Sequence, residues 1–279
     1  MFTRLSNSWE LVKASWGVLM ADKELLLFPV VSFIASLVVI ATFAVPTILA
    51  GVFDEFTGIP IVGYVIGFFF YVVLYFVTIF SNSALVGAAM IRLDGGDPTV
   101  ADGFRIAMKH FSSILGYAVI SATVGMILRA IAERGGIIGR IVSSFIGFAW
   151  GVATFLVVPI LVVEGVGPMD SVKRSAELLK RTWGEQLVGN FGIGSVFGLL
   201  FVMLIFGGIG AIVLAAATGA AGLIITVVLL VVVAFMLLAM LNGALSGIYT
   251  AAVYRYATTG ETAGFDPNII KNTFKAKAD

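Results

Sequence analysis

The side chains that could do chemistry here are few, and the most polar of them lie within or beside long apolar stretches. Asn82, Asn190 and Asn242 are three such residues, and each amide offers both hydrogen-bond donors and an acceptor. They could build a polar site at the centre of a helix bundle. Alternatively, they could join neighbouring helices, at about 0.6 to 2 kcal/mol for each hydrogen bond. The second interpretation is the simpler one, and the first stays open for Asn82 and Asn242.

Catalytic groups are harder to find. Glu164 could act as an acid inside the membrane, but it stands at the end of an apolar stretch, where capping or pairing with the basic segment that follows is the ordinary role. The sequence contains no cysteine, which excludes disulfides, thiolate metal sites and cysteine nucleophiles. The single histidine, His110, has no second histidine with which to bind a metal ion. We therefore expect no enzyme, no cofactor and no metal site.

The elements that carry these residues are apolar helices. Hydrophobic residues make up 60% of the 279 residues and charged residues only 12%, against roughly 45–50% and about 25% in soluble domains. Six apolar stretches stand out: Leu25–Val52, Ile61–Ile91, Ile114–Leu128, Ile141–Val163, Leu187–Ala217 and Ala221–Tyr254. About 20 helical residues cross a bilayer core of ~30 Å, and the third stretch reaches that length if it begins near Phe111 and continues past Arg129. The sequence predicts an all-α membrane protein with six transmembrane helices.

The sixth stretch is longer than a bilayer core needs. We expect one helix that leaves the membrane and ends near Thr258–Gly260, where Gly260 can serve as its C-terminal cap. Asn242-Gly243 is the one place where this helix could break. A break there would create a polar site at mid-membrane, of the kind that discontinuous helices form in transporters.

Lysine and arginine are distributed unevenly among the segments that join the six stretches. Of the 17 such residues, all but Arg129, Arg134 and Arg140 lie at the two termini or in the second and fourth loops, which share one side of the membrane. Because basic loops stay in the cytoplasm, we expect both termini there, with residues 261–279 as a cytoplasmic tail.

Three polar segments on that side have the pattern of amphipathic helices, and they precede the first, third and fifth stretches. In the first of them, Trp9, Val12 and Trp16 recur every three or four residues and define one apolar face. We expect Asp102 and Asp170 to be the N-caps of the second and third of these helices. We expect the helices to lie in the membrane plane, or alternatively to extend the spans and pack on one another. The residues expected at the membrane interface are Trp9, Lys13, Trp16, Arg105, Lys109, Lys173, Arg174, Lys180, Arg181 and Trp183.

The order amphipathic helix, span, span occurs three times, and the sequence itself repeats. SWELVKASWG at 8–17 shares six of ten residues with SAELLKRTWG at 175–184, and the motif Asn-x-Ala-Leu-x-Gly occurs at 82–87 and 242–247. We expect a single transmembrane domain, 1–260, made of three units, 1–93, 94–164 and 165–260. Each unit adds two spans, so the units are parallel repeats, and a pseudo-threefold axis along the membrane normal is the simplest arrangement.

The run VVPILVVEGVGPMDSVKRSAELLKRTWG at 157–184 resembles a signature of prokaryotic six-span membrane proteins of uncharacterised families. It is also similar to the membrane domain attached to some glycerophosphoryl diester phosphodiesterases. The shared features are Pro159, Glu164, Gly165 and Ser175. The resemblance implies the six-span fold and a multi-pass place in a prokaryotic cell membrane. It does not imply the phosphodiesterase activity, because the catalytic domain is absent.

Two roles fit these observations. The first is a non-catalytic integral membrane protein that organises lipids or partner proteins at the cytoplasmic leaflet, with membrane lipids, other membrane proteins or a second copy of the chain as partners. The alternative is a transporter or channel for a lipid or another apolar substrate, because coupled transport of ions usually needs ionisable residues inside the spans. The sequence has no basic cluster beyond those in the loops, so we expect no nucleic-acid binding.

Overall fold

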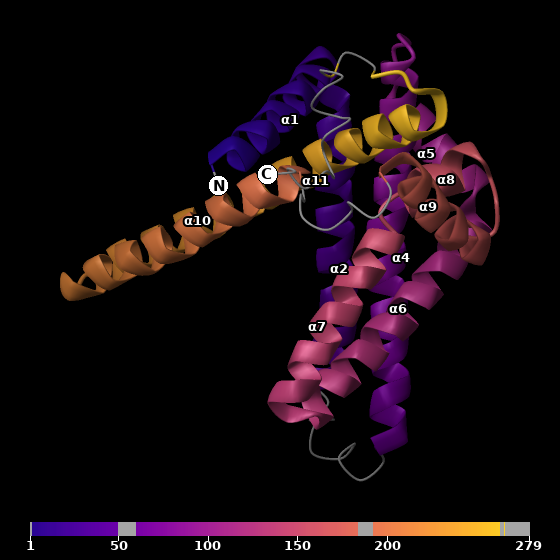
Figure 1. The fold of residues 1–279 in the computed structure, drawn as a ribbon. Helices are drawn as coiled ribbons and strands as arrows, with labels where there is room; N and C mark the ends of the chain where they lie inside the picture. The colour runs from indigo at the N-terminus through magenta and orange to yellow at the C-terminus, as the bar shows by residue number, and fades with distance from the viewer. Residues whose placement is uncertain (1, 50–59, 184–191, 263–264, 266–279) are drawn as a thin grey trace.

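The computed structural model describes residues 2–49, 60–183, 192–262 and 265, and within them it contains helices and no strand. In chain order the elements are α1 (Phe2–Ala21), the 3-10 helix η1 (Lys23–Leu26), α2 (Leu27–Leu49), α4 (Pro60–Leu93), α5 (Val100–Lys109), α6 (Phe111–Arg134), α7 (Gly136–Ala153), α8 (Val157–Val163), α9 (Pro168–Trp183), α10 (Gly192–Ala217) and α11 (Ala221–Thr259) (Figure 1). Six of the described helical segments are long and apolar enough to cross a membrane. The chain is therefore an all-α protein with six candidate spans, as predicted.

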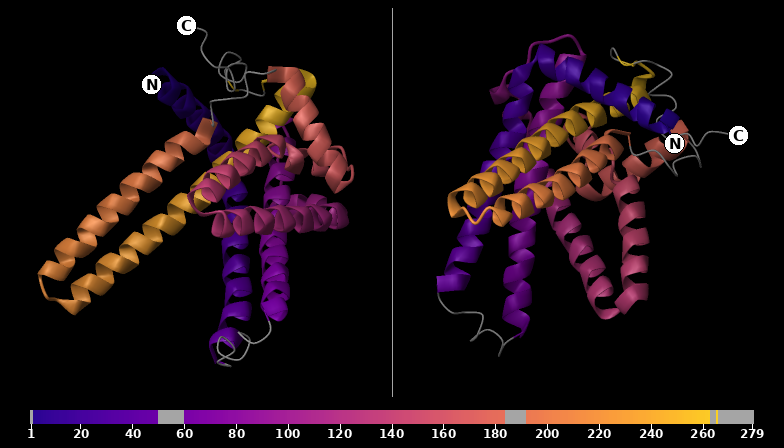
Figure 2. Two further views of the ribbon diagram at one scale, coloured as in Figure 1. Left: turned by 60° about the horizontal axis from the view of Figure 1, so that its bottom comes forward. Right: turned by 90° about the vertical axis from the view of Figure 1, so that its left-hand side faces the viewer.

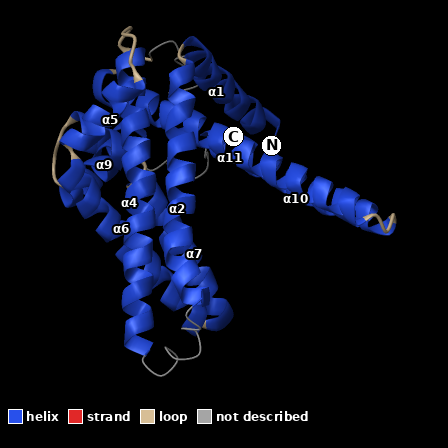
Figure 3. Ribbon diagram, turned by 180° about the vertical axis from the view of Figure 1, so that it is seen from behind, coloured by secondary structure: helices blue, strands red, loops and turns tan. Residues whose placement is uncertain are grey.

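The long helices of the six spans form three helical hairpins, α2–α4, α6–α7 and α10–α11 (Figure 1). The hairpins start from a common layer made of α1, η1, α5, α8 and α9, in which η1 and α8 are the ends of the first and fourth spans. We call these five elements the connector layer. The first two hairpins run side by side, and the described helices of all three hairpins extend away from the connector layer (Figure 1). The α10–α11 hairpin diverges from the other two at a large angle (Figures 2 and 3). The order of elements thus repeats, whereas the hairpins do not follow the threefold axis expected from the sequence.

Glycines with positive φ mark corresponding points of the three units. Gly95 (φ 86°), Gly165 (φ 67°) and Gly260 (φ 77°) each follow the helix that completes a unit. Gly136 (φ 58°) and Gly219 (φ 70°) lie in the far turns of the second and third hairpins. Only glycine adopts this conformation without strain, and it is the usual residue just after a helix. These five glycines therefore allow the turns that end the units and the turns within the second and third hairpins.

Two predictions about span length are confirmed. The third span, α6, begins at Phe111 and continues through Arg129 to Arg134. The sixth span, α11, is one helix of 39 residues without a break at Asn242, and Gly260 caps it by donating its N–H to the Tyr256 carbonyl at 2.9 Å.

The fourth span differs from the single helix expected over 141–163. It is divided into α7 and α8, with a turn at 154–156. Pro159 explains the break, because its ring would collide with the carbonyl of Phe155, four residues earlier, and it has no N–H to donate.

Helix α1 also departs from its predicted face. In α1, Leu11, Val12 and Leu19 are buried where the helix packs on α10 and α11. Trp9 and Trp16 are 48% and 42% exposed. The single apolar face expected for this helix is therefore divided between a packed face and an exposed one.

The two predicted N-caps are one turn out of place. The N-cap of α5 is Thr99, whose side chain accepts the N–H of Asp102, while Asp102 accepts the N–H of Thr99 in return. Asp170 likewise lies in the first turn of α9, which begins at Pro168. A carboxylate is favourable both at the N-cap and in the first turn, because the helix dipole is positive at its N-terminus. Composition alone therefore cannot tell these two positions apart.

The protein core lies beside the connector layer, not along the whole length of the spans. Small side chains make it compact: Ala84, Ala88, Ala89, Ala244, Ala251 and Ala252 are at most 1% exposed. Towards the far turns, large apolar side chains face outward, such as Phe145 (73%) and Leu214 (72%). This is the pattern of hairpins whose far parts are surrounded by lipid.

Candidate functional site

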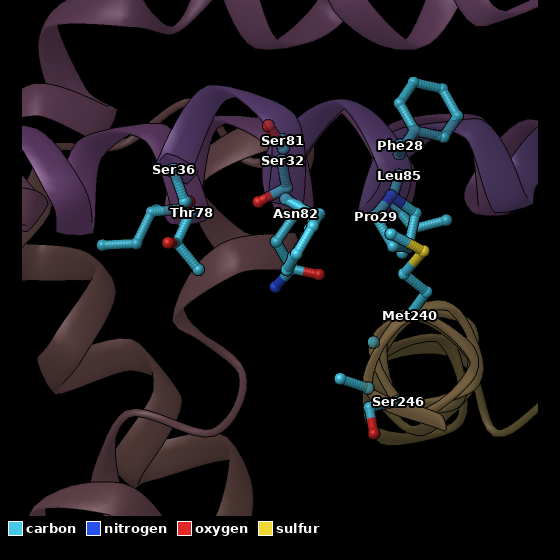
Figure 4. Close-up of a pocket in the computed structure, with 14 residues that line it drawn as sticks. Phe28, Pro29, Ser32, Ser36, Thr78, Ser81, Asn82, Leu85, Met240 and Ser246 are labelled. Carbon is cyan, nitrogen blue, oxygen red and sulfur yellow. The ribbon is translucent and has the colours of Figure 1, made fainter. Parts of the chain in front are cut away.

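A cleft of about 420 Å³ opens where α11 crosses α2 and α4 (Figure 4). Its walls are mostly apolar, but six polar side chains line it: Ser32 and Ser36 from α2, Thr78, Ser81 and Asn82 from α4, and Ser246 from α11. None of the lining residues is charged. A volume of this size is within the range of small-molecule sites.

The cleft exists because α11 approaches the first hairpin closely at one end of the crossing only. Gly243 and Gly247 lie four residues apart on the same face of α11. A Cβ at Gly247 would lie only 2.4 Å from Cδ2 of Leu85, and one at Gly243 would touch Pro29 at 3.6 Å. Such small residues let helices approach in lipid. Towards its far turn α11 diverges from α2 and α4 (Figure 2), which leaves the cleft.

The structure separates the two asparagines that the sequence placed in equivalent positions. Asn82 lines the cleft. Asn242 does not line it, and its Oδ1 accepts a long hydrogen bond of 3.4 Å from the Ser246 hydroxyl. No hydrogen bond joins the two amides among the described residues. The polar site predicted from these residues is therefore built from Asn82 and from hydroxyls that the sequence argument passed over.

Those hydroxyls had a signal in the sequence. Ser32 and Ser36 are spaced by four residues, and Thr78 and Asn82 likewise, so each pair shares a helix face. Ser81 is 4% exposed and yet borders the cleft. Within the described part of the chain no hydrogen bond is found for the side chains of Ser32, Ser36, Ser81 and Asn82. Single serines are common in apolar helices, which is why only the tertiary structure showed that these face one space.

A second polar group lies in the connector layer, at the end of α8. Arg174 Nε donates to both Glu164 carboxylate oxygens at 3.3 and 3.4 Å, and the Tyr254 hydroxyl donates to Oε1 at 3.2 Å. The interpretation of Glu164 as a residue that pairs with the following basic helix is confirmed. The group ties the end of the second unit to α9 and α11.

Ser175 supplies a hydrogen-bond acceptor at the break in the fourth span. The N–H of Leu156 falls in the turn between α7 and α8 and donates to Ser175 Oγ at 3.0 Å, and both residues are fully buried. An unsatisfied N–H there would cost about 1–3 kcal/mol. Two features of the sequence signature therefore act at the same point of the fold: Pro159 breaks the helix, and Ser175 accepts the N–H that the break leaves free.

Arg255 joins two units that are far apart in sequence. Its guanidinium, 16% exposed, pairs with Asp94 after α4 and with Glu261 after α11, the latter at 2.7 Å. The sequence shows Arg255 only as one of the basic residues near the C-terminus, because nothing local indicates a partner 161 positions away.

The predicted interface residues occupy three helices of the connector layer. Trp9, Lys13 and Trp16 share the exposed face of α1. Exposed cations lie on α5 (Arg105, Lys109) and α9 (Lys173, Lys180, Arg181). Three of the cations pair with an acid one turn earlier: Lys13 with Glu10, Arg105 with Asp102 and Lys173 with Asp170. Arg174 is the partner of Glu164, and the side chain of Trp183 lies outside the described residues.

Two titratable groups of the connector region have shifted pKa values. Burial raises the pKa of the Asp22 carboxyl, which caps η1, although its hydrogen bond from the Glu24 N–H acts in the opposite direction. Burial, and secondarily Lys109, lowers the pKa of His110, which lies close to Gly165. His110 is therefore neutral at pH 7. In the described ranges no three His, Asp or Glu side chains are grouped as a metal site.

Comparison with known proteins gives a family but no function. A family model, described as a family of unknown function (DUF6159), matches residues 61–265, which is more than half of the chain and runs from α4 to the end of α11. No curated protein and no solved structure matches the chain. The similarity to the membrane domain of glycerophosphoryl diester phosphodiesterases thus finds no support in these comparisons.

Proposed function

The chain belongs to DUF6159, a family of unknown function, and we propose that it is a non-catalytic membrane protein that organises lipids or partner proteins at the cytoplasmic leaflet of a prokaryotic cell membrane. The observation that carries this proposal is the connector layer. Helices α1, α5 and α9 lie at the end where all three hairpins begin, and between them they expose tryptophan and basic residues there (Figure 1).

The exposed face of α1 has the chemistry of a membrane interface. Trp9 and Trp16 are seven residues apart with Lys13 between them, and all three side chains are exposed. Indole rings prefer the depth of the lipid headgroups, and each lysine or arginine near an anionic surface contributes about 1 kcal/mol of attraction. Met108 and Lys109 of α5 are exposed in the same way. The layer is thus suited to hold anionic lipid headgroups.

The orientation belongs to the same proposal, because the anionic leaflet is the cytoplasmic one. The chain has no cysteine, so single cysteines give clean reporters. In intact cells, Thr218→Cys in the far turn of the third hairpin should react with an impermeant thiol reagent, and Asp97→Cys between α4 and α5 should not. The opposite labelling would overturn the orientation.

The lipid role is tested by removing charge from one end at a time. Lys109 and Lys180 are exposed and have no ion pair among the described residues. The variant Lys109→Gln/Lys180→Gln should retain roughly tenfold less phosphatidylglycerol than the native chain, measured by native mass spectrometry after exchange from mixed phosphatidylglycerol and phosphatidylcholine micelles. The matched control is Arg134→Gln/Arg140→Gln, at the far turn of the second hairpin, which should retain native amounts. Equal losses in both variants would contradict the proposal.

A carrier for a lipid is the second candidate, and the cleft between α2, α4 and α11 favours it. The unbroken helices at Asn82 and Asn242 favour the first candidate, because carriers often use discontinuous helices at mid-membrane. Movement of a fluorescent lipid between the leaflets of vesicles that contain the purified chain would favour the carrier.

A further inference from the structure

The cleft between α2, α4 and α11 has polar groups that neither the fold nor the connector layer uses. We propose that it binds one uncharged acyl lipid by its hydroxyl and ester groups, of the diacylglycerol class, with the acyl chains left in the bilayer. This inference deepens the proposed function, on which it rests, by naming a lipid class and its site.

The polar residues of the cleft lie below the ester region of the leaflet, inside the hydrocarbon core. At ~1.5 Å per residue, Ser32 and Ser36 lie about 8 and 14 Å from the start of α2, which adjoins the connector layer. Half of a hydrocarbon core is about 15 Å. These side chains of the cleft therefore lie between the ester region of one leaflet and the middle of the membrane, a depth that favours an uncharged glycerolipid over one with a charged headgroup.

The lining requires an occupant that makes hydrogen bonds. Polar groups that face hydrocarbon without a partner cost several kcal/mol, and the side chains of Ser32, Ser36, Ser81 and Asn82 have no hydrogen-bond partner among the described residues. Figure 4 shows Asn82 on the α2–α4 side of the space and Met240 reaching across it from α11. Serine hydroxyls can donate to ester carbonyls, and the Asn82 amide can both donate to an ester and accept from a hydroxyl.

The uncharged lining and the volume of the cleft limit the class of lipid that it can bind. No lining residue is charged, so a phosphate group drawn into the cleft would lose its hydration without gaining a cation, which is strongly unfavourable. The volume of about 420 Å³ lies towards the lower end of the range of small-molecule sites. That accommodates a glycerol unit with its ester groups and the first methylenes. Two complete acyl chains do not fit.

The test is photolabelling of the full chain in phosphatidylcholine nanodiscs that contain a small fraction of photoactivatable diacylglycerol. We expect labelled peptides from α2, α4 and α11. Asn82→Leu, which removes the amide at similar volume, should reduce the labelling about tenfold. Ala239→Phe, which fills the cleft from an exposed position on α11, should abolish it. Ser144→Ala removes a hydroxyl from the exposed surface of α7 and should leave it unchanged.

The outcomes separate this inference from the proposed function. Native labelling in both cleft variants overturns the inference, as does equal labelling of the cleft by photoactivatable phosphatidylcholine. The thermal midpoints of both variants should lie near that of Ser144→Ala, so that lost labelling is not lost folding. If Lys109→Gln/Lys180→Gln retains anionic lipid like the native chain while the cleft is still labelled specifically, the proposed function fails and the cleft stands.

Discussion

Two helices return from a far turn to the connector layer and meet at their ends, yet they are built in opposite ways. The fourth span is divided at 154–156 into α7 and α8, whereas α11 runs unbroken over 39 residues. The divided span contains Pro159, and the unbroken one contains Gly243 and Gly247. Proline inside a helix removes one N–H donor, and its ring collides with the carbonyl four residues earlier. Glycine in lipid does not break a helix when a neighbouring helix packs against the space that its missing side chain leaves.

The divided fourth span and the unbroken α11 are stabilised by different kinds of contact. The divided span needs a polar partner from outside, Ser175, for the N–H that its break leaves free. The unbroken span needs close packing against Leu85 and Asn82 of α4. The two ends are then joined by the hydrogen bond from Tyr254 to Glu164.

The largest effect is expected at the packed crossing. Gly247→Leu would force α11 away from Leu85, because even a Cβ would lie 2.4 Å from that side chain. We expect a loss of about 3 kcal/mol, seen as a large fall of the thermal midpoint in detergent. Gly222→Leu is the matched control on the same helix, where nothing lies within 4 Å, and it should not destabilise. Similar midpoints for the two variants would refute the packing argument.

The next effect tests the divided span. Ser175→Ala leaves the buried Leu156 N–H without a partner, for an expected loss of about 1–3 kcal/mol of stability. In a Pro159→Ala background the helix can re-form, so the same substitution should cost less, and a double-mutant cycle measures the difference. Glu177→Ala, exposed on the same helix, should be neutral. Strict additivity of the two substitutions would show that Pro159 and Ser175 act independently.

A smaller effect is expected where the two helices meet. Glu164→Gln removes the ion pair with Arg174 but keeps an acceptor for Tyr254, and both charged groups are partly exposed. We expect a loss of roughly 1 kcal/mol that shrinks as salt is added. Asp97→Asn removes an ion pair whose carboxylate is 96% exposed and should change almost nothing. An equal effect of both changes would mean that Glu164 is only a surface residue.

The smallest effect is expected at Asn242. Its one described hydrogen bond is weak at 3.4 Å and lies within α11, so Asn242→Leu should change stability by less than about 0.6 kcal/mol. Helix content by circular dichroism should not change. A marked loss of helix would mean that α11 depends on a polar turn at this position, and the comparison with the fourth span would fail.

The sequence by itself determined the class of the fold and most of its span limits. Apolar length set the six helices, because a bilayer core accepts only segments of that kind, and Gly260 set the end of α11 through its own backbone preference. The pairing of Glu164 with the following helix was also local, since its partner is ten residues away. These features depend on neighbours in the chain, which a sequence shows directly.

Only the tertiary structure decided which polar residues share a space. Ser32, Ser81 and Ser246 come from three helices and look like isolated hydroxyls in the sequence, and Asp94 meets Arg255 across most of the chain. The direction of the α10–α11 hairpin was equally hidden (Figure 2). In an apolar chain hydrophobicity is nearly uniform, so it does not indicate which face meets lipid and which meets protein. That choice is made by side-chain size and fit, which appear only when the helices are placed together.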